Sequence, residues 1–417
     1  MRRGAAAATA PGPGASSNRS TLGIVFTTIL LDFIGFSVLI PVLPIYATRL
    51  GATSFEVGLI LSLYAAAQLV FLPVWGWLSD RVGRRPVILI SLLGTVASFL
   101  LLASGDSLAT IYIARILAGF FAASIGTAQA VVTDVTPDSK RAQGMGMIGA
   151  AFGLGFVLGP ALGGWLSAFD ERAPFYGIAV LAFLNLVVAF ARLPESHPPE
   201  RRRRDLRGLA RTLVPTPLRF LVAHHDRRIG RYLFLFFQLF TAFAALEAMF
   251  SVYLNKRFSM QPLEVGYVFA VIGVSIALTQ GVLIRRLAPW LGEVRLVVIG
   301  LVVQGAGLGL IPLVSAPEWL YLVGPVIAVG NGLWFPSFTA LYSRACHTEN
   351  AGELMGESSS MATTGRIVGP LWAGLAMDRI DLGAPFVLAG GLTFAALALF
   401  WLWRETLLGD AQGPAAS

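Results

Sequence analysis

The sequence predicts an all-α membrane protein with twelve transmembrane helices, arranged as two six-helix bundles. Three observations lead to this prediction: 56% of the residues are hydrophobic, only 13% are charged, and the mean hydropathy is +0.72. Soluble domains carry about 25% charged residues, so a water-soluble globular enzyme is nearly excluded. The 417 residues also accommodate twelve runs of about 20 apolar residues, the length that crosses a hydrocarbon core.

Hydropathy divides the apolar runs into two sets of six, and one polar stretch separates the sets. Each run predicts one transmembrane helix. The first set lies at residues 22–46, 55–78, 87–104, 108–133, 144–167 and 174–192, and the second at 230–254, 264–284, 295–314, 319–342, 354–377 and 385–403.

The segments outside the runs complete a five-part organisation. Residues 1–21 are rich in Ala, Pro, Gly and Ser without periodicity, which predicts disorder. The polar stretch contains an arginine run and an amphipathic segment from Asp205 to Val222, which predicts a helix on the membrane surface. The expected parts are a cytoplasmic N-terminal tail at 1–21, an N-terminal bundle at 22–192, a cytoplasmic linker at 193–229, a C-terminal bundle at 230–404 and a cytoplasmic tail at 405–417.

The positions of the basic residues predict the orientation. If the N-terminus is cytoplasmic, the cytoplasmic loops and tails carry 24 Lys and Arg residues and the opposite loops carry 5. Cytoplasmic segments hold the excess of Lys and Arg, so both termini are expected in the cytoplasm. The two remaining arginines, Arg115 and Arg366, fall inside predicted helices. Because the other charges lie between the apolar runs, the formal net charge of +8 does not indicate a nucleic-acid partner.

Several classes of chemistry are excluded by residues that the sequence lacks. Cys346 is the single cysteine, so neither an intrachain disulfide nor a thiolate metal cluster can form. All four histidines lie outside the apolar runs, which rules out an intramembrane histidine relay. The only lysines are Lys140 and Lys256, and neither belongs to a phosphate-binding loop that would use ATP. With no nucleophile and base arranged for catalysis, we expect no enzyme, no metal and no cofactor.

An internal repeat relates the two sets of runs. The fifth run contains Gly155-Phe-Val-Leu-Gly159-Pro160, and the eleventh contains Gly365-Arg-Ile-Val-Gly369-Pro370 at an offset of about 210 residues. Gly76-Trp-Leu after the second run is echoed by Gly281-Val-Leu after the eighth. Repeats of six helices in the same orientation predict two bundles related by an axis along the membrane normal, with a substrate site between them near the midplane.

The loop after the second run carries the most specific motif, Gly76-Trp-Leu-Ser-Asp80-Arg81-Val-Gly83-Arg84-Arg85-Pro86. It resembles the cytoplasmic loop signature of the major facilitator superfamily. The resemblance implies that Asp80, Arg84 and Asp134 form a cytoplasmic latch that holds an outward-open state, with Asp80 facing the positive N-terminal end of the eleventh helix. In the alternative interpretation the arginines serve only membrane orientation, which explains neither Asp80 nor Gly83.

The fifth run is similar to the signature of the antiporter branch of this superfamily. Its glycines and proline would allow close helix packing and a bend, giving a rocking point between helices. An ordinary contact between helices rich in small residues is the alternative. The motif residues are Gly155, Gly159, Pro160, Gly163 and Gly164.

The first run carries an acid, Asp32, within a segment similar to the first helix of tetracycline-type drug and proton antiporters. A lone carboxylate in hydrocarbon is costly when charged, so it must face a partner or a water-filled cavity. Asp32 is the expected proton carrier and Arg115 its expected partner, since Ala114-Arg115 resembles the arginine motif of the fourth helix. A purely structural ion pair is the alternative.

A second set of intramembrane charges comprises Glu247 and Arg366. Glu247 is a further candidate for proton coupling, although it lies late in its run and has an alternative position near the outer surface. Arg366 raises the prospect of an anionic or zwitterionic substrate. Polar and aromatic residues that are candidates to line an amphipathic cavity with Arg366 are Tyr64, Gln68, Gln129, Phe236, Gln238, Phe240, Phe243, Asn331 and Trp334.

These features predict a secondary transporter driven by the proton gradient, which exports amphipathic drugs from a bacterial cell and resembles the tetracycline efflux group over residues 22–404. We expect a monomer in the inner membrane with protons and a small molecule as its partners. A symporter or uniporter for an organic anion is the alternative within the same fold. A membrane receptor or scaffold without transport activity is the alternative from another class.

Overall fold

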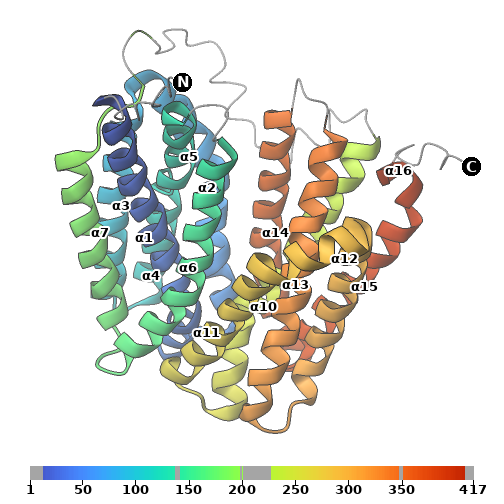
Figure 1. Cartoon of the computed structure of the whole chain (residues 1–417). Coiled ribbons are helices and arrows are strands. Elements are labelled where there is room, and N and C mark those ends of the chain that lie inside the picture. The colour runs from blue at the N-terminus through green and yellow to red at the C-terminus, as the bar shows by residue number, and fades with distance from the viewer. Residues whose placement is uncertain (1–12, 137–140, 198–199, 201–226, 347–350, 409–417) are drawn as a thin grey trace, which may run out of the picture.

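The computed structural model describes residues 13–136, 141–197, 200, 227–346 and 351–408. Helices account for nearly all of these residues, and no strand occurs among them. They form two bundles that stand side by side (Figure 1), as the sequence predicts. The predicted surface helix at 205–222 lies outside the described residues. We call the end of the molecule near both chain termini the terminal face, and the other end the opposite face.

The N-terminal bundle follows the first six apolar runs. Helix α1 begins within the segment 1–21, where the sequence predicts disorder, so this expectation does not hold from residue 13 onward. The fourth run forms two helices instead of one. The helices are α1 (Pro13–Arg49), α2 (Ser54–Val82), α3 (Arg84–Ser104), α4 (Leu108–Phe120), α5 (Ser124–Val135), α6 (Arg141–Ser167) and α7 (Ala173–Arg192).

The break between α4 and α5 depends on Ser91 of α3. The Ser91 hydroxyl accepts the backbone N–H groups of Ala123 at 3.3 Å and Ser124 at 3.0 Å, and it donates to the carbonyl of Phe121. These bonds satisfy backbone groups that an interrupted helix leaves without partners. The break thereby fixes Ser124 at the start of α5, deep inside the bundle.

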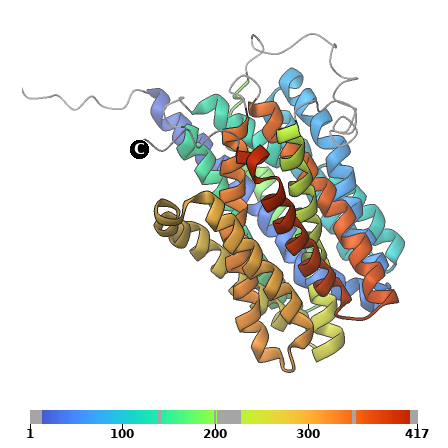
Figure 2. The same cartoon turned by 90° about the vertical axis from the view of Figure 1, so that its right-hand side faces the viewer.

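The C-terminal bundle contains the second set of runs. The helices are α10 (Arg227–Phe258), α11 (Pro262–Leu278), η3 (Thr279–Leu283), α12 (Ile284–Leu310), α13 (Leu320–Ala345), α14 (Ala351–Arg379), α15 (Ala384–Leu402) and the short α16 (Arg404–Leu408), with single turns at η4 (Ile311–Leu313) and η5 (Pro317–Trp319). The chain reverses at Gly292, whose φ of 72° favours glycine. The preceding residues 284–291 stand away from the bundle (Figure 2), and Trp290 is 86% exposed.

Ten helical segments within the described residues are long and apolar enough to cross a membrane. One of them, Pro262–Leu313, includes the reversal at Gly292 and therefore holds two of the twelve predicted runs. Helix α14 carries the eleventh run and is not among the ten. The chain is thus a multi-pass membrane protein with the predicted division into two bundles.

The bundles meet in the half of the molecule near the opposite face. A Cβ on Gly58 of α2 would lie 2.2 Å from the carbonyl oxygen of Pro370 in α14, and one on Gly266 of α11 would lie 2.6 Å from that of Pro160 in α6. Nearer the terminal face, Gly76 of α2 and Gly356 of α14 have open space where a Cβ would stand. This conformation is therefore closed at the opposite face and parted at the terminal face.

Candidate functional site

The helical period of α1 aligns Asp32 with a row of apolar residues that faces the other bundle. Phe36, Leu39 and Ile40 follow Asp32 at spacings of four, seven and eight residues. Asp32, Phe36 and Leu39 line an open cavity, whose volume of about 900 Å³ includes the solvent space at its mouth. Ile40 lines the next cavity, of about 490 Å³, which Phe36 and Leu39 share. This row therefore exposes one face of α1 to two adjacent cavities.

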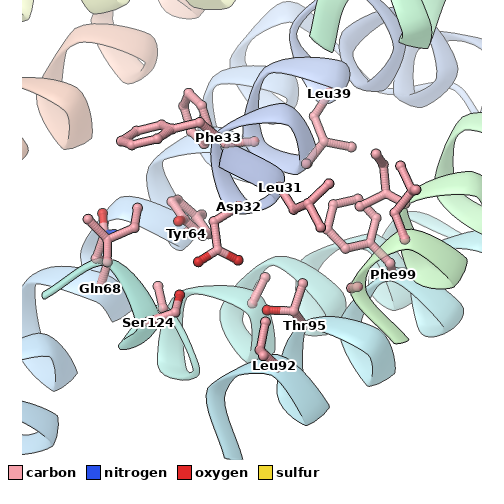
Figure 3. A pocket seen from close by; sticks show the side chains of 18 of the residues that line it. Leu31, Asp32, Phe33, Leu39, Tyr64, Gln68, Leu92, Thr95, Phe99 and Ser124 are labelled. Carbon is pink, nitrogen blue, oxygen red and sulfur yellow. The ribbon is translucent and has the colours of Figure 1, made fainter. Parts of the chain in front are cut away.

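The Asp32 carboxylate is buried among polar groups of the N-terminal bundle. Tyr64, Ser124 and Thr95 surround it (Figure 3), and all three line the same cavity. Its Oδ2 atom has no hydrogen-bond partner among the residues that the structure describes. Burial of a carboxylate oxygen without a partner is costly in hydrocarbon, so this atom is available to a proton, a water or a ligand group.

Arg115, on α4, lines the same cavity as Asp32 but does not pair with it. The arginine is only 3% exposed, and its guanidinium carbon lies 4.4 Å from the centre of the Tyr64 ring. This cation–π contact holds the guanidinium over the ring, and no ion pair within 4.0 Å joins it to a described carboxylate. The expected Asp32–Arg115 ion pair is thus absent from this conformation.

Glu247 and Arg366 approach each other across α10 and α14. Arg366 Nη2 lies 3.7 Å from Glu247 Oε1, and the same guanidinium lies 4.6 Å from the centre of the Phe36 ring in the N-terminal bundle. Both residues line the 490 Å³ cavity together with Arg115. Glu247 therefore belongs to the internal space and not to the outer surface, and Arg366 contacts both bundles.

Glu247 also lies at the edge of a third cavity, of about 570 Å³, whose other lining residues are apolar. Phe243, Phe250 and Phe269 contribute aromatic rings to it. An acid beside an apolar chamber suits an amphipathic ligand, because the polar and the apolar parts of such a molecule then each find a matching surface.

The structure sorts the residues predicted to line the cavity into two groups. Tyr64, Gln68 and Arg366 line the cavity that contains Asp32, and Phe243 lines the apolar cavity. The other candidates do not line these cavities, and their part in a substrate cavity stays a prediction: Phe236, Phe240 and Trp334 pack in the aromatic core of the C-terminal bundle, Gln238 bonds the carbonyl of Leu392, Asn331 bonds Gln304, and Gln129 is exposed on α5.

The residues predicted to form a latch lie in one cluster at the terminal face of the N-terminal bundle. Arg84 Nη1 lies 2.6 Å from Asp80 Oδ1, and Arg84 Nε lies 3.3 Å from Asp134 Oδ2. Gly83 joins α2 to α3 with a φ of 114°, a conformation that other residues rarely adopt. Arg81 instead stacks on Trp77, with its guanidinium carbon 3.8 Å from the ring centre.

In the part of the chain that the structure describes, no hydrogen bond or ion pair joins this cluster to its predicted partner, the eleventh helix. The ion pairs of Asp80 and Asp134 stay within the N-terminal bundle. Gly76, one turn before Asp80, faces open space. Both observations fit a latch that is released while the terminal face is parted.

The glycine and proline motif of the fifth run packs α6 against α1 and against the other bundle. A Cβ on Gly159 would lie 1.8 Å from Ser37 Oγ, and one on Gly163 would lie 2.7 Å from the carbonyl of Val38. Ser37 Oγ donates to the carbonyl of Gly155 at 2.7 Å. Gly164 faces the carbonyl of Pro262 in α11 at a Cβ distance of 2.8 Å, so the motif ends at the contact between the bundles.

One residue of this interface was missed by the sequence reasoning. Asp378, at the end of α14, accepts the backbone N–H groups of Ser54 and Phe55 at the start of α2. A carboxylate near the end of a long run resembles Asp80, and that likeness was the available signal. Its partners were not predictable, because they are main-chain groups of a helix more than 300 residues away.

Two repeated helical bundles around a charged central cavity define a polytopic membrane transporter. The family model for the Major Facilitator Superfamily matches residues 25–357, and the chain belongs to this superfamily. The tetracycline resistance protein, class C, of Escherichia coli is 30% identical over 364 residues, which cover 85% of this chain and 89% of that protein. Multidrug resistance protein 1 of Bacillus subtilis (strain 168) is 28% identical over 388 residues, which cover 92% and 96% of the two chains.

Solved structures of transporters share the fold. The crystal structure of the human organic anion transporter MFSD10 (TETRAN) matches with a TM-score of 0.70 and 27% identity, covering 92% of this chain and 99% of that one. The structure of the nucleoside transporter NupG has a TM-score of 0.77 at 14% identity over 91% of this chain, and that likeness concerns the fold alone.

Proposed function

We propose that the chain is a proton-coupled antiporter, which exports amphipathic drugs or similar small molecules by alternating access. The observation that carries this proposal is Asp32, a buried intramembrane acid with an unpaired oxygen on the wall of the central cavity. The relatives named for tetracycline and multidrug resistance support the direction of transport.

In the proposed cycle, a proton and the cargo compete for the cavity. Asp32 takes a proton when the cavity opens to the outside, and the two bundles then rock to open it to the cytoplasm. Cargo that enters from the cytoplasm displaces the proton, because the ionised carboxylate favours the loaded cavity. The parted terminal face would be cytoplasmic, in agreement with the distribution of Lys and Arg.

Accumulation in everted membrane vesicles tests the proposal. With tetracycline and ethidium as probes, Asp32→Asn should abolish proton-driven accumulation at normal expression, since the amide cannot exchange a proton. Asp106→Asn, which removes a carboxylate paired with Arg172 on the exposed opposite face, is the matched control and should retain transport. Full accumulation by the Asp32→Asn variant would refute the role of Asp32.

A second candidate function is proton-coupled symport, or uniport, of an organic anion. Two arginines, Arg115 and Arg366, line the cavity that contains Asp32, and they favour negative cargo. The likeness to a human organic anion transporter supports the same class. The direction of the pH change on adding substrate to vesicles separates the two: antiport and symport move protons in opposite directions relative to the substrate.

A further inference from the structure

The charges in the central cavity are balanced in number but not in pairing. Two acids, Asp32 and Glu247, and two bases, Arg115 and Arg366, line the two adjacent cavities. Glu247 and Arg366 approach to 3.7 Å and offset each other. Asp32 and Arg115 belong to no ion pair within 4.0 Å in the part of the chain that the structure describes.

Of these two unpaired residues, Arg115 has the greater need of a counter-ion. Its side chain is buried, its Nε atom has no hydrogen-bond partner among the described residues, and its guanidinium carbon lies 4.4 Å from the centre of the Tyr64 ring. A buried guanidinium without a counter-ion is costly, and the five N–H donors of arginine match a carboxylate in a bidentate arrangement. The free Nε therefore marks a place for an acceptor that carries negative charge.

Asp32 presents the complementary group on the same cavity wall. Its Oδ2 atom is buried without a partner, although Ser124 lies beside the carboxylate (Figure 3). The Tyr64 side chain lines the cavity with both charges and lies against Arg115. A single molecule that bridges the two would meet an acid, an aromatic ring and a base.

We propose that the preferred cargo is an amphipathic zwitterion. Its cationic group binds Asp32, its anionic group binds Arg115, and its apolar body lies against Tyr64 and Phe36. This inference rests on the proposed function and deepens it, because the cation is the part of the cargo that displaces the proton from Asp32. The wall of this cavity offers both polar and apolar side chains, as recognition of an amphipathic molecule requires.

A binding experiment on the purified full chain in nanodiscs tests the inference. The probes are two unrelated zwitterions, ciprofloxacin and ampicillin, each with its methyl ester, which keeps only the cation, and its N-acetyl derivative, which keeps only the anion. Equilibrium dialysis at pH 7.4 with EDTA present avoids metal chelates. Each zwitterion should bind about tenfold more tightly than either of its derivatives, since each masked charge loses one charge-assisted interaction.

Charge-removing variants assign each group of the probe to its residue. Arg115→Gln should weaken the binding of the zwitterion and of the N-acetyl derivative about tenfold, and it should leave the affinity for the ester unchanged. Asp32→Asn should weaken the binding of the zwitterion and of the ester, and it should leave the affinity for the N-acetyl derivative unchanged. Arg172→Gln and Asp106→Asn, which remove the same charges from an exposed pair, are the matched controls and should change none of the affinities. If Arg115→Gln does not fold, Arg115→Lys should retain the preference for the zwitterions.

The possible results separate this inference from the proposed function. Binding of an N-acetyl derivative as tightly as its parent would show an anion site and overturn the inference. Binding of an ester as tightly as its parent would show a cation site and would overturn the inference. Failure of both zwitterions to bind would also overturn the inference. If an ester still releases protons from energised wild-type vesicles but not from Asp32→Asn vesicles, the proposed antiport through Asp32 is retained, and only the preference for a zwitterion is refuted.

Discussion

The carboxylate of Asp378 caps α2 from the other bundle: its Oδ2 atom accepts the backbone N–H of Phe55 at 2.8 Å. The Oδ1 atom accepts the N–H of Ser54 at 3.1 Å, and Lys256 Nζ lies 3.0 Å from Ser54 Oγ. A carboxylate at a helix N-terminus is favourable both as a hydrogen-bond acceptor and through the helix dipole. These bonds cross from the C-terminal to the N-terminal bundle and hold the opposite face closed.

We therefore expect Asp378→Ala to destabilise the conformation closed at the opposite face. Loss of a helix cap costs about 1 kcal/mol, which corresponds to roughly a fivefold shift between the two conformations. In a Cys346→Ser background, a cysteine at position 36 reports the shift through faster labelling by an impermeant maleimide applied at the opposite face.

Asp381→Ala is the control for Asp378→Ala, because the Asp381 side chain accepts the N–H of Gly383 in its own loop and no described hydrogen bond joins it to the other bundle. Its labelling rate should equal that of the parent. Equal rates for Asp378→Ala and Asp381→Ala would mean that the Asp378 cap does not hold the bundles together.

The register of α2 on α14 predicts the contact of the alternate conformation. Ser54 faces Gly374, and four residues further along α2, Gly58 faces Pro370. Continuing this antiparallel register along both helices brings Gly76 opposite Gly352. Both glycines now have open space at the Cβ position, as expected for surfaces that meet when the terminal face closes.

Cysteines at these two positions should cross-link only when the terminal face is closed. In the Cys346→Ser background, Gly76→Cys/Gly352→Cys should form a disulfide under copper phenanthroline, because a disulfide requires Cα atoms about 4.4–6.8 Å apart. Gly76→Cys paired with Gly391→Cys, on α15, should not cross-link. Absence of cross-linking in both the presence and the absence of cargo would contradict this register.

The sequence predicts well those features that depend on local pattern. Runs of apolar residues locate the helices because the bilayer imposes the length of each run. Asp80 and Arg84 are only four residues apart in the sequence, so the junction of α2 and α3 places them side by side. Asp32 is found because an acid in hydrocarbon requires an explanation. Its neighbours Phe36 and Leu39 would also have been found by following the helical period from Asp32.

Features that depend on packing between distant helices were not predictable in this way. In a membrane helix, lipid-facing and core-facing residues are both apolar, so the sequence does not distinguish the packed Trp334 from a cavity residue. The absence of an Asp32–Arg115 pair depends on the Tyr64 ring, which lies on a third helix. The break before Ser124 depends on a hydroxyl of α3, and hydropathy contains no signal for it.

Substitution of Gly159 should destabilise the folded protein. An alanine Cβ there would lie 1.8 Å from Ser37 Oγ and 2.9 Å from the carbonyl of Ile34, so α6 and α1 must separate. Overpacking of this kind costs about 1–3 kcal/mol. Gly159→Ala should lower the Tm in nanodiscs, while Gly149→Ala, on the open side of the same helix, should leave the Tm unchanged or raise it slightly. A Tm for Gly159→Ala equal to that of Gly149→Ala would show that the close packing is not required.

Substitution of Asp80 should slow transport without changing which compounds bind. In the present conformation Arg84 is held by both Asp80 and Asp134, and the cluster lies at the terminal face, apart from the cavity that contains Asp32. Removing Asp80 leaves Arg84 paired with Asp134, so the parted conformation persists, but the closed terminal face loses the carboxylate expected to cap α14. Initial rates in everted vesicles should therefore fall several-fold for Asp80→Ala, while the affinities of a compound panel stay constant. Altered selectivity at unchanged turnover would instead place Asp80 in cargo recognition, against the latch that its motif implies.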